Sequence, residues 1–135
     1  MIDSPAAGRT SPAGSRRPAV GEAGESLAAR YLERAGMRIL ARNWRSGHRE
    51  LDLVAQEGRV VAFVEVKTRS PGPQRPLEAL SRAKRRELRR AAEDWIHSHP
   101  GLGREFRFDV VGVRFLPGRA PEIEHIPDAF YADDA

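Results

Sequence analysis

The stretch "ELDLVAQEGRVVAFVEVK", residues 50–67, contains the strongest structural signal in this chain. Its two apolar runs, separated by the turn residues "QEGR", are typical of a β-hairpin. Glu65 and Lys67 interrupt the second run. Lysine is rare here, because only Lys67 and Lys84 among the 23 basic residues are lysine. A lysine inside this strand therefore needs a reason beyond composition.

Alternation along the hairpin separates its side chains into a polar and an apolar face. A two-residue loop at residues 57–58 would pair Glu50 with Glu65 and Asp52 with Phe63. One face would then carry the polar residues Glu50, Asp52, Glu65 and Lys67. The other face would be an apolar packing surface made of Leu51, Leu53, Val60, Ala62, Val64 and Val66.

The rest of the chain predicts one helix before the hairpin, and a helix and strands after it. The first helix should cover about residues 22–35 and end at Gly36, because glycine tolerates the left-handed conformation. The second should cover residues 82–98, with Ser81 as its N-cap. Strands are expected at residues 38–45, 50–55, 59–67, 106–115 and 122–126. The predicted fold is α/β, in the order α-β-β-β-α-β, with a mixed central sheet flanked by helices.

The first helix places a carboxylate on its apolar face. At helical spacing, Glu25 shares a face with Ala28, Ala29 and Leu32, opposite a face formed by Ser26, Arg30 and Glu33. Glu25 should therefore point inward. A buried carboxylate is costly without a partner, so it should meet a cation, a metal or a hydrogen-bond donor.

Length and composition indicate one soluble domain. Residues 1–20, rich in Pro, Gly, Ser and Ala, are expected to be a disordered leader, residues 21–130 the folded domain and residues 131–135 an acidic tail. No apolar run approaches the roughly 20 residues of a membrane span. No signal peptide is apparent, so we expect a cytoplasmic protein. The absence of cysteine excludes disulfides, thiolate catalysis and cysteine-ligated zinc.

Charge is unevenly distributed along the chain. The net charge is +4; residues 1–20 contribute +2 and residues 120–135 contribute −5, which leaves +7 on the residues between them. A basic body suggests a polyanionic partner such as nucleic acid, although charge also serves solubility. Much of it lies in "SRAKRRELRR", residues 81–90, on Arg82, Arg85, Arg86, Arg89 and Arg90. This face is either simply solvated or contacts phosphates without reading base sequence.

Three carboxylates on one strand face repel one another and require a compensating charge. Carboxylate oxygens suit a hard cation such as Mg²⁺ or Mn²⁺, which keeps several waters for a substrate phosphate. A neighbouring lysine can orient or deprotonate the attacking water and offset charge in the transition state. A surface ion pair between Glu65 and Lys67 is the alternative. Asp52 on the same face and an inward Glu25 favour the metal.

The ordered motifs of this chain resemble those of the YraN-type family of uncharacterised bacterial proteins. These motifs are Gly24-Glu25, "ELDLV" at 50–54, "FVEVKTR" at 63–69, Lys84 in the second helix and "RFDVV" at 107–111. That family is similar to archaeal Holliday-junction resolvases and to restriction-endonuclease-like nucleases, which share an acid followed by an acid-x-Lys signature. The resemblance covers about residues 21–130.

The resemblance implies a restriction-endonuclease-like fold and a role for each matching residue. Asp52 and Glu65 would bind Mg²⁺ or Mn²⁺, joined by the carbonyl of Val66. Lys67 would be the catalytic lysine. Glu25 would be a further catalytic residue that contacts the metal or a water.

Further positions match the family pattern or depart from it. Glu50 matches the acid that precedes the family's catalytic aspartate and would support the site. Lys84 would contact the DNA backbone, together with Arg69 and the basic helix. Arg49 and Arg75 depart from the family, which usually has glycine there, and an ion pair of Arg49 with Glu50 would alter the role of Glu50.

Aromatic, histidine and remaining acidic residues favour structural roles. Trp44 and Trp95 are expected in the core rather than stacked on bases. Asp109 should contact Arg107 or a neighbouring helix, and His125 is isolated in sequence.

Three functions are compatible with the sequence. The first is a metal-dependent endonuclease for branched or otherwise non-duplex DNA; the branched substrate and a homodimer rest on the resolvase resemblance. The second is a non-catalytic nucleic-acid-binding module. The third is an interaction protein whose acidic tail binds a basic partner.

Overall fold

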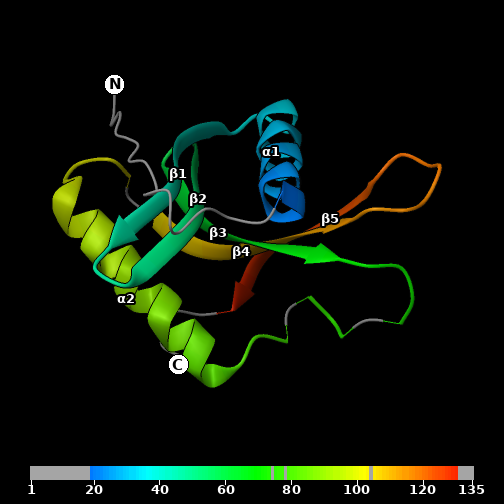
Figure 1. The fold of residues 1–135 in the computed structure, drawn as a ribbon. Coiled ribbons are helices and arrows are strands. Elements are labelled where there is room, and N and C mark those ends of the chain that lie inside the picture. The colour runs from blue at the N-terminus through cyan, green and yellow to red at the C-terminus, as the bar shows by residue number, and fades with distance from the viewer. Residues whose placement is uncertain (1–18, 74, 78, 104, 131–135) are drawn as a thin grey trace.

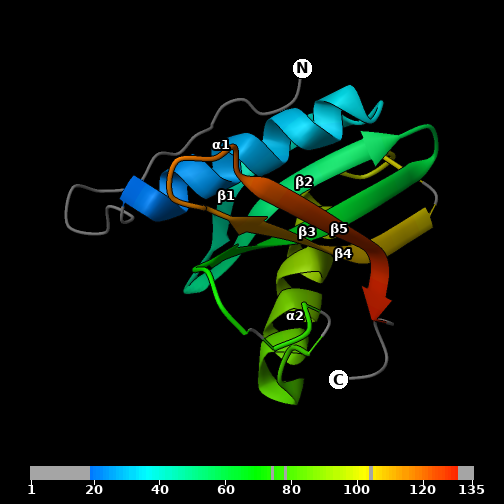
Figure 2. The same cartoon turned by 90° about the vertical axis from the view of Figure 1, so that its right-hand side faces the viewer.

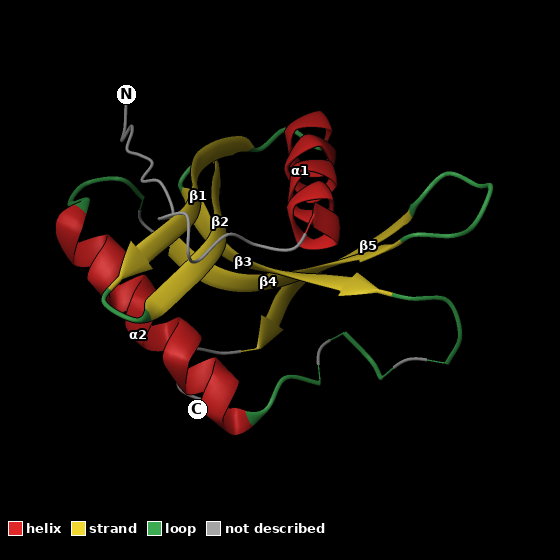
Figure 3. Cartoon of the chain, viewed as in Figure 1, coloured by secondary structure: helices red, strands yellow, loops and turns green. Residues whose placement is uncertain are grey.

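The chain forms a five-stranded sheet between two helices in a computed structural model that describes residues 19–73, 75–77, 79–103 and 105–130. These residues form α1 (Ala19–Arg34), β1 (Arg38–Ser46), β2 (Arg49–Glu57), β3 (Val60–Arg69), α2 (Arg82–Ser98), β4 (Glu105–Arg114) and β5 (Glu122–Phe130). Figures 1 and 3 show α1 and α2 on opposite sides of the sheet. The predicted α/β fold, a mixed sheet flanked by helices, is confirmed.

The strands lie in chain order, β1-β2-β3-β4-β5. The β3–β4 pair is parallel and every other neighbouring pair is antiparallel. Antiparallel neighbours can be joined by tight turns, whereas the parallel pair needs a crossover, which α2 provides. The β3-α2-β4 unit therefore joins the middle strand of the sheet to its parallel neighbour; Figure 2 shows the domain turned by 90°.

The helix boundaries follow local capping chemistry. The predicted bounds of α2 are confirmed, and the Ser81 side chain accepts a 3.0 Å hydrogen bond from the Lys84 backbone N–H. Gly36 follows α1 with a φ of +100°, the left-handed conformation expected there. The start of α1 at Ala19 lies two residues inside the predicted leader. Residues 1–18 and the predicted acidic tail lie outside the described residues.

The hairpin between β2 and β3 differs from its prediction by the position of the turn. Its ladder pairs Val54 with Phe63 and Glu57 with Val60, so Gly58 and Arg59 form the loop. The predicted pairing of Asp52 with Phe63 is therefore wrong. Gly58 occupies the first loop position with a φ of +60°, and this glycine requirement moves the turn by one residue. The register differs from the prediction by two residues. Because side chains alternate with a period of two, the side chains of β3 still point to the predicted faces of the sheet.

The predicted apolar face of the hairpin is interrupted in β2. Leu51 packs in the cluster on the α2 side of the sheet, whereas Leu53 packs in the cluster on the α1 side. Between the β1 partners of these two leucines lies Asn43, whose φ is +51°. This break in alternation places Glu50 on the face opposite Leu51, away from the α2 side.

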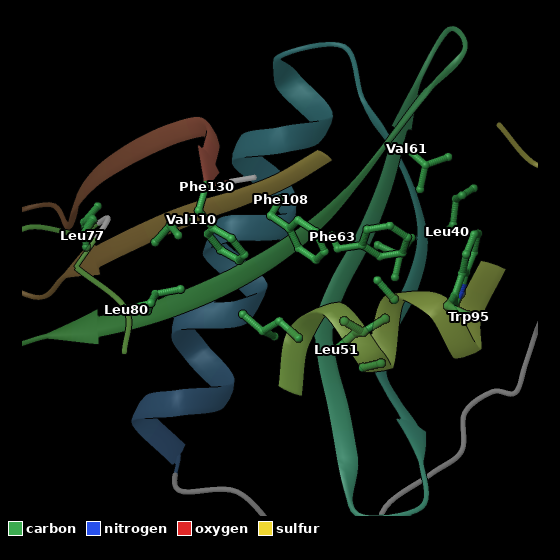
Figure 4. Packing of buried hydrophobic residues seen from close by; sticks show 14 residues of the cluster. Leu40, Leu51, Val61, Phe63, Leu77, Leu80, Trp95, Phe108, Val110 and Phe130 are labelled. Carbon is green, nitrogen blue, oxygen red and sulfur yellow. The ribbon is translucent and has the colours of Figure 1, made fainter. Parts of the chain in front are cut away.

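Two apolar clusters hold the helices onto the sheet. The larger lies under α2 and is centred on Phe63, Trp95 and Phe108 (Figure 4). The other joins Ala28 and Leu32 of α1 to the opposite sheet face. Trp95 is fully buried and Trp44 packs against the larger cluster, consistent with the core role predicted for both.

A buried polar network ties β5 to β4. The Asp109 carboxylate accepts hydrogen bonds from Arg107 at 2.9 and 3.2 Å and from the Asp128 backbone N–H at 2.9 Å. His125 lies 2.9 Å from the same carboxylate, a contact that its position in the sequence did not suggest. Burial favours a higher pKa for Asp109, but these hydrogen bonds and the Arg107 charge outweigh it and lower the pKa. The contact predicted with Arg107 is confirmed.

Gly24 allows α1 to approach β3 closely. A Cβ atom at this position would lie 2.5 Å from Thr68 Oγ1, well inside van der Waals contact. The start of α1 is therefore seated against the residue that follows Lys67.

We expect Gly24→Ala to lower the free energy of unfolding by about 1–2 kcal/mol, because Thr68 must move. Thr68→Ala removes the obstructing hydroxyl, so the double variant should recover that loss and gain up to about 1 kcal/mol of helix propensity. Urea unfolding followed by tryptophan fluorescence measures all four proteins. An equal cost of Gly24→Ala in both backgrounds would contradict the steric explanation.

Candidate functional site

The candidate site forms where β2 and β3 separate. Their ladder ends at the pair Leu53 and Val64. One residue further along β2, Asp52 Oδ2 accepts a 2.8 Å hydrogen bond from the backbone N–H of Val66. A side chain thus replaces a ladder partner and fixes the Asp52 carboxylate beside β3. Val66, expected to contribute its carbonyl, contacts Asp52 through its amide.

Glu65 is the buried carboxylate of this site, with only 8% of its side chain exposed. Burial and, after it, the negative charge of Asp52 raise the pKa of Glu65 to about 7. The ammonium groups of Lys84 and Lys67 oppose that rise. The charge of Asp52 therefore acts on Glu65, which agrees with the proximity that the sequence predicted for these two carboxylates.

Both lysines of the chain meet at the same oxygen of Glu65. Lys84 Nζ lies 3.5 Å and Lys67 Nζ 3.9 Å from Glu65 Oε2. Lys67 comes from β3, and Lys84 from the first turn of α2, which the Ser81 cap positions. We call Asp52, Glu65, Lys67 and Lys84 the lysine–carboxylate site. Lys84 was expected at the DNA backbone, and its contact with Glu65 was not predicted; the scarcity of lysine is the one sequence feature that Lys84 shares with Lys67.

Glu25 and Glu50 lie differently with respect to this site. Glu25 is 2% exposed, and its neighbour Gly24 packs against Thr68 at the end of β3. The inward orientation predicted for Glu25 is confirmed. Glu50 lies 4.0 Å from Arg45, its cross-strand partner, on the sheet face away from α2.

Arg49 does not make the ion pair with Glu50 that the sequence suggested. Its Nε donates a 3.0 Å hydrogen bond to Glu87 of α2. This contact and that of Ser46 with Asp94, at 2.8 Å, fasten the β1–β2 turn to α2.

The carboxylates of the site suit a hard divalent cation that keeps several waters better than a metal ion enclosed by protein ligands alone. Among the described residues, no group of three or more His, Asp or Glu side chains could hold a metal ion. Two adjacent carboxylates with mutually unfavourable charge match Mg²⁺, which typically takes one or two protein carboxylates and keeps waters. A cation between Asp52 and Glu65 would offset the negative charge of Asp52, which adds to the effect of burial in raising the pKa of Glu65.

The basic residues of α2 have unequal access to a partner. Arg82 and Arg86 are exposed, whereas Arg85 and Arg89 are half-buried. The Arg85 guanidinium lies 6.0 Å from the centre of the Phe130 ring, so part of its surface packs inside the domain. Arg82 and Arg86 are the better placed to reach phosphates.

A comparison with known protein families identifies the family of this chain. The family model described as "Uncharacterised protein family UPF0102" matches residues 24–113. The chain belongs to the UPF0102 family. The matched range contains Glu25 and the whole lysine–carboxylate site. Membership in the YraN-type family, inferred from the motifs, is confirmed.

Curated UPF0102 proteins match along most of their length. That of Nocardia farcinica is 47% identical over 115 residues, which cover 84% of this chain and 91% of the relative. That of Rhodococcus opacus is 48% identical over 113 residues, covering 83% and 96%. That of Anaeromyxobacter dehalogenans is 46% identical over 121 residues, covering 89% and 90%.

Neither helix of this UPF0102 protein, within the residues described, has the length and apolarity needed to cross a membrane.

Metal-free protein should lose stability as the pH rises because of Glu65. The folded state, with a pKa of about 7, holds the proton more tightly than the unfolded chain, with a pKa of 4.5. The contribution of Glu65 to the free energy of unfolding is therefore fully present below pH 4.5 and is lost as the pH rises through about 7. The total loss is roughly 3 kcal/mol at most. In EDTA, Glu65→Gln should remove this dependence. Urea unfolding at pH 5 and pH 8 tests it, with the exposed Glu93→Gln as control; parallel profiles for wild type and Glu65→Gln would refute it.

Proposed function

We propose that this UPF0102 protein is a Mg²⁺- or Mn²⁺-dependent endonuclease that hydrolyses DNA phosphodiesters. The observation that carries the proposal is the convergence of two carboxylates and both lysines at one point, where β2 separates from β3. A buried acid whose pKa is raised toward neutrality by burial and by a neighbouring carboxylate is a feature of many functional sites.

Asp52 and Glu65 would hold the divalent cation, together with the carbonyl of Val66. When bound, such a cation supplies positive charge to polarise a phosphate and lowers the pKa of a coordinated water. Glu25, buried in α1 beside the end of β3, would contribute a further contact to the cation or the water. The carboxylates that repel one another in the metal-free protein become the ligands.

Lys67 is the residue that would act on the reacting phosphate. Its side chain is 43% exposed and lies 3.9 Å from Glu65 Oε2, so it reaches both the buried carboxylate and solvent. In hydrolysis, a water oxygen bonds to phosphorus, the bond to the leaving oxygen breaks and a proton moves to that oxygen. An ammonium group at this position can orient the water and donate hydrogen bonds where negative charge increases.

DNA binding would use the exposed arginines of α2, including Arg82 and Arg86. Contacts of this kind hold the phosphate backbone and carry no base code. Branched or non-duplex DNA as the substrate, and a homodimer as the active form, rest on the resolvase resemblance. The alternative is a non-catalytic nucleic-acid-binding module, which the absence of a three-carboxylate group among the described residues favours.

Cleavage of labelled four-way-junction, flap, single-stranded and duplex DNA with Mg²⁺ or Mn²⁺ tests the proposal. Asp52→Asn, Glu65→Gln and Lys67→Ala should each reduce the rate at least ~100-fold, because each removes transition-state stabilisation. EDTA should abolish cleavage, and Glu93→Gln should retain it. Salt-sensitive DNA binding that survives Lys67→Ala and requires no divalent cation, without cleavage of any substrate, would support the binding module instead.

A further inference from the structure

A small basic pocket lies beside the lysine–carboxylate site. It has a volume of about 240 Å³ and lies between the end of β3 and the segment that leads into α2. After β3, the chain turns back toward α2 (Figure 1). Its polar lining consists of Lys67, Thr68, Arg69 and Arg75. All charged groups among these described lining residues are cations, so the pocket concentrates positive potential.

The apolar wall of the pocket is held by core packing. Leu77 and Leu80, which line it, are 5% and 8% exposed. Leu77 lies over Gly112, where a Cβ atom would come within 2.7 Å of its Cδ2. Gly112 is the register partner of Lys67 in the parallel β3–β4 pair. This glycine therefore lets Leu77 sit against the sheet next to Lys67 and fixes the pocket there.

Arg69 and Arg75 connect the two sides of the pocket. The Arg69 guanidinium donates a hydrogen bond to the backbone carbonyl of Arg75, which orients Arg69 and ties the segment to β3. The Arg75 side chain is exposed, and no ion pair joins it to an acid among the described residues. Both guanidinium groups have planar sets of donors that match the oxygens of a phosphate.

We propose that this pocket, the Arg75 pocket, binds one nucleotide of the DNA substrate next to the bond that is cut. The cations would hold its phosphate, while the leucine wall would contact its sugar or base. An apolar wall gives no benefit to free inorganic phosphate, so the pocket favours a phosphate ester. A volume of about 240 Å³ is smaller than the usual range for larger ligands, from about 300 Å³, and suits a single nucleotide unit.

Lys67 determines where this nucleotide lies. The residue lines the pocket and also approaches Glu65 Oε2 at 3.9 Å. A phosphate in the pocket is thus within reach of the same ammonium group that would act on the scissile phosphate. The inference rests on the proposed function for its substrate, but binding to the pocket can be measured without cleavage.

The direct test is calorimetric titration with thymidine 3′,5′-bisphosphate in EDTA. Arg75→Ala should weaken binding about tenfold, the loss expected for one charged contact. Arg30→Ala removes an equal charge from the exposed face of α1 and should leave affinity within about twofold. Equal affinity of Arg75→Ala and wild type would overturn the proposal.

Two further ligands identify what the pocket recognises. Inorganic phosphate should bind more weakly than the bisphosphate, and thymidine without phosphate should not bind detectably. Inorganic phosphate binding as tightly as the bisphosphate would overturn the assignment to a nucleotide.

Cleavage kinetics separate this inference from the proposed function. Arg75→Ala should raise KM for an oligonucleotide about tenfold and leave kcat within about threefold, because Arg75 contacts a neighbouring nucleotide rather than the reacting atoms. A fall in kcat with unchanged KM would contradict the assigned position. If wild type cuts no substrate yet binds the bisphosphate through Arg75, the endonuclease proposal fails and the pocket stands.

Discussion

The hydrogen bond from the Val66 backbone to Asp52 is the interaction on which the site depends. A strand N–H normally bonds to a neighbouring backbone carbonyl, but β2 stops pairing with β3 at Leu53 and Val64. The Asp52 side chain satisfies the donor instead. This lets β3 continue along β4 as far as Arg69 while β2 turns away. The same bond places one carboxylate beside the next, so strand separation and site formation share one cause.

The choice of lysine at the site has a physical explanation. An arginine would bind a carboxylate through its planar fork and occupy both oxygens, whereas an ammonium group is a compact charge on a flexible stem. Lys67 and Lys84 both approach a single oxygen of Glu65, at 3.9 and 3.5 Å. In a chain that otherwise uses arginine, this arrangement offsets the charge of Glu65 and leaves its other oxygen to other ligands.

Periodicity predicted the helices, the strands and the inward Glu25 because those depend on local patterns. The hairpin turn was misplaced, yet Glu65 and Lys67 kept their facing, since a change of two residues preserves alternation. The break at Asn43 and Asp52 was not predictable, because a positive φ at a non-glycine residue is set by tertiary packing. Glu50 was misplaced for this reason. Contacts of Lys84 with Glu65 and of His125 with Asp109 join separate elements, so no local pattern could specify them.

The position of Lys67 between the two sites has an energetic consequence. In metal-free protein, its ammonium group helps to offset the charge of Glu65. An anion in the Arg75 pocket would draw on that same ammonium group and add negative charge near the carboxylates. A divalent cation held by Asp52 and Glu65 would remove this conflict and free Lys67 to interact with the phosphate. Cation and nucleotide would therefore each strengthen the binding of the other, because coupling between two sites is reciprocal. With such coupling, Lys67 would be free to interact with the scissile phosphate only when both the cation and DNA are bound.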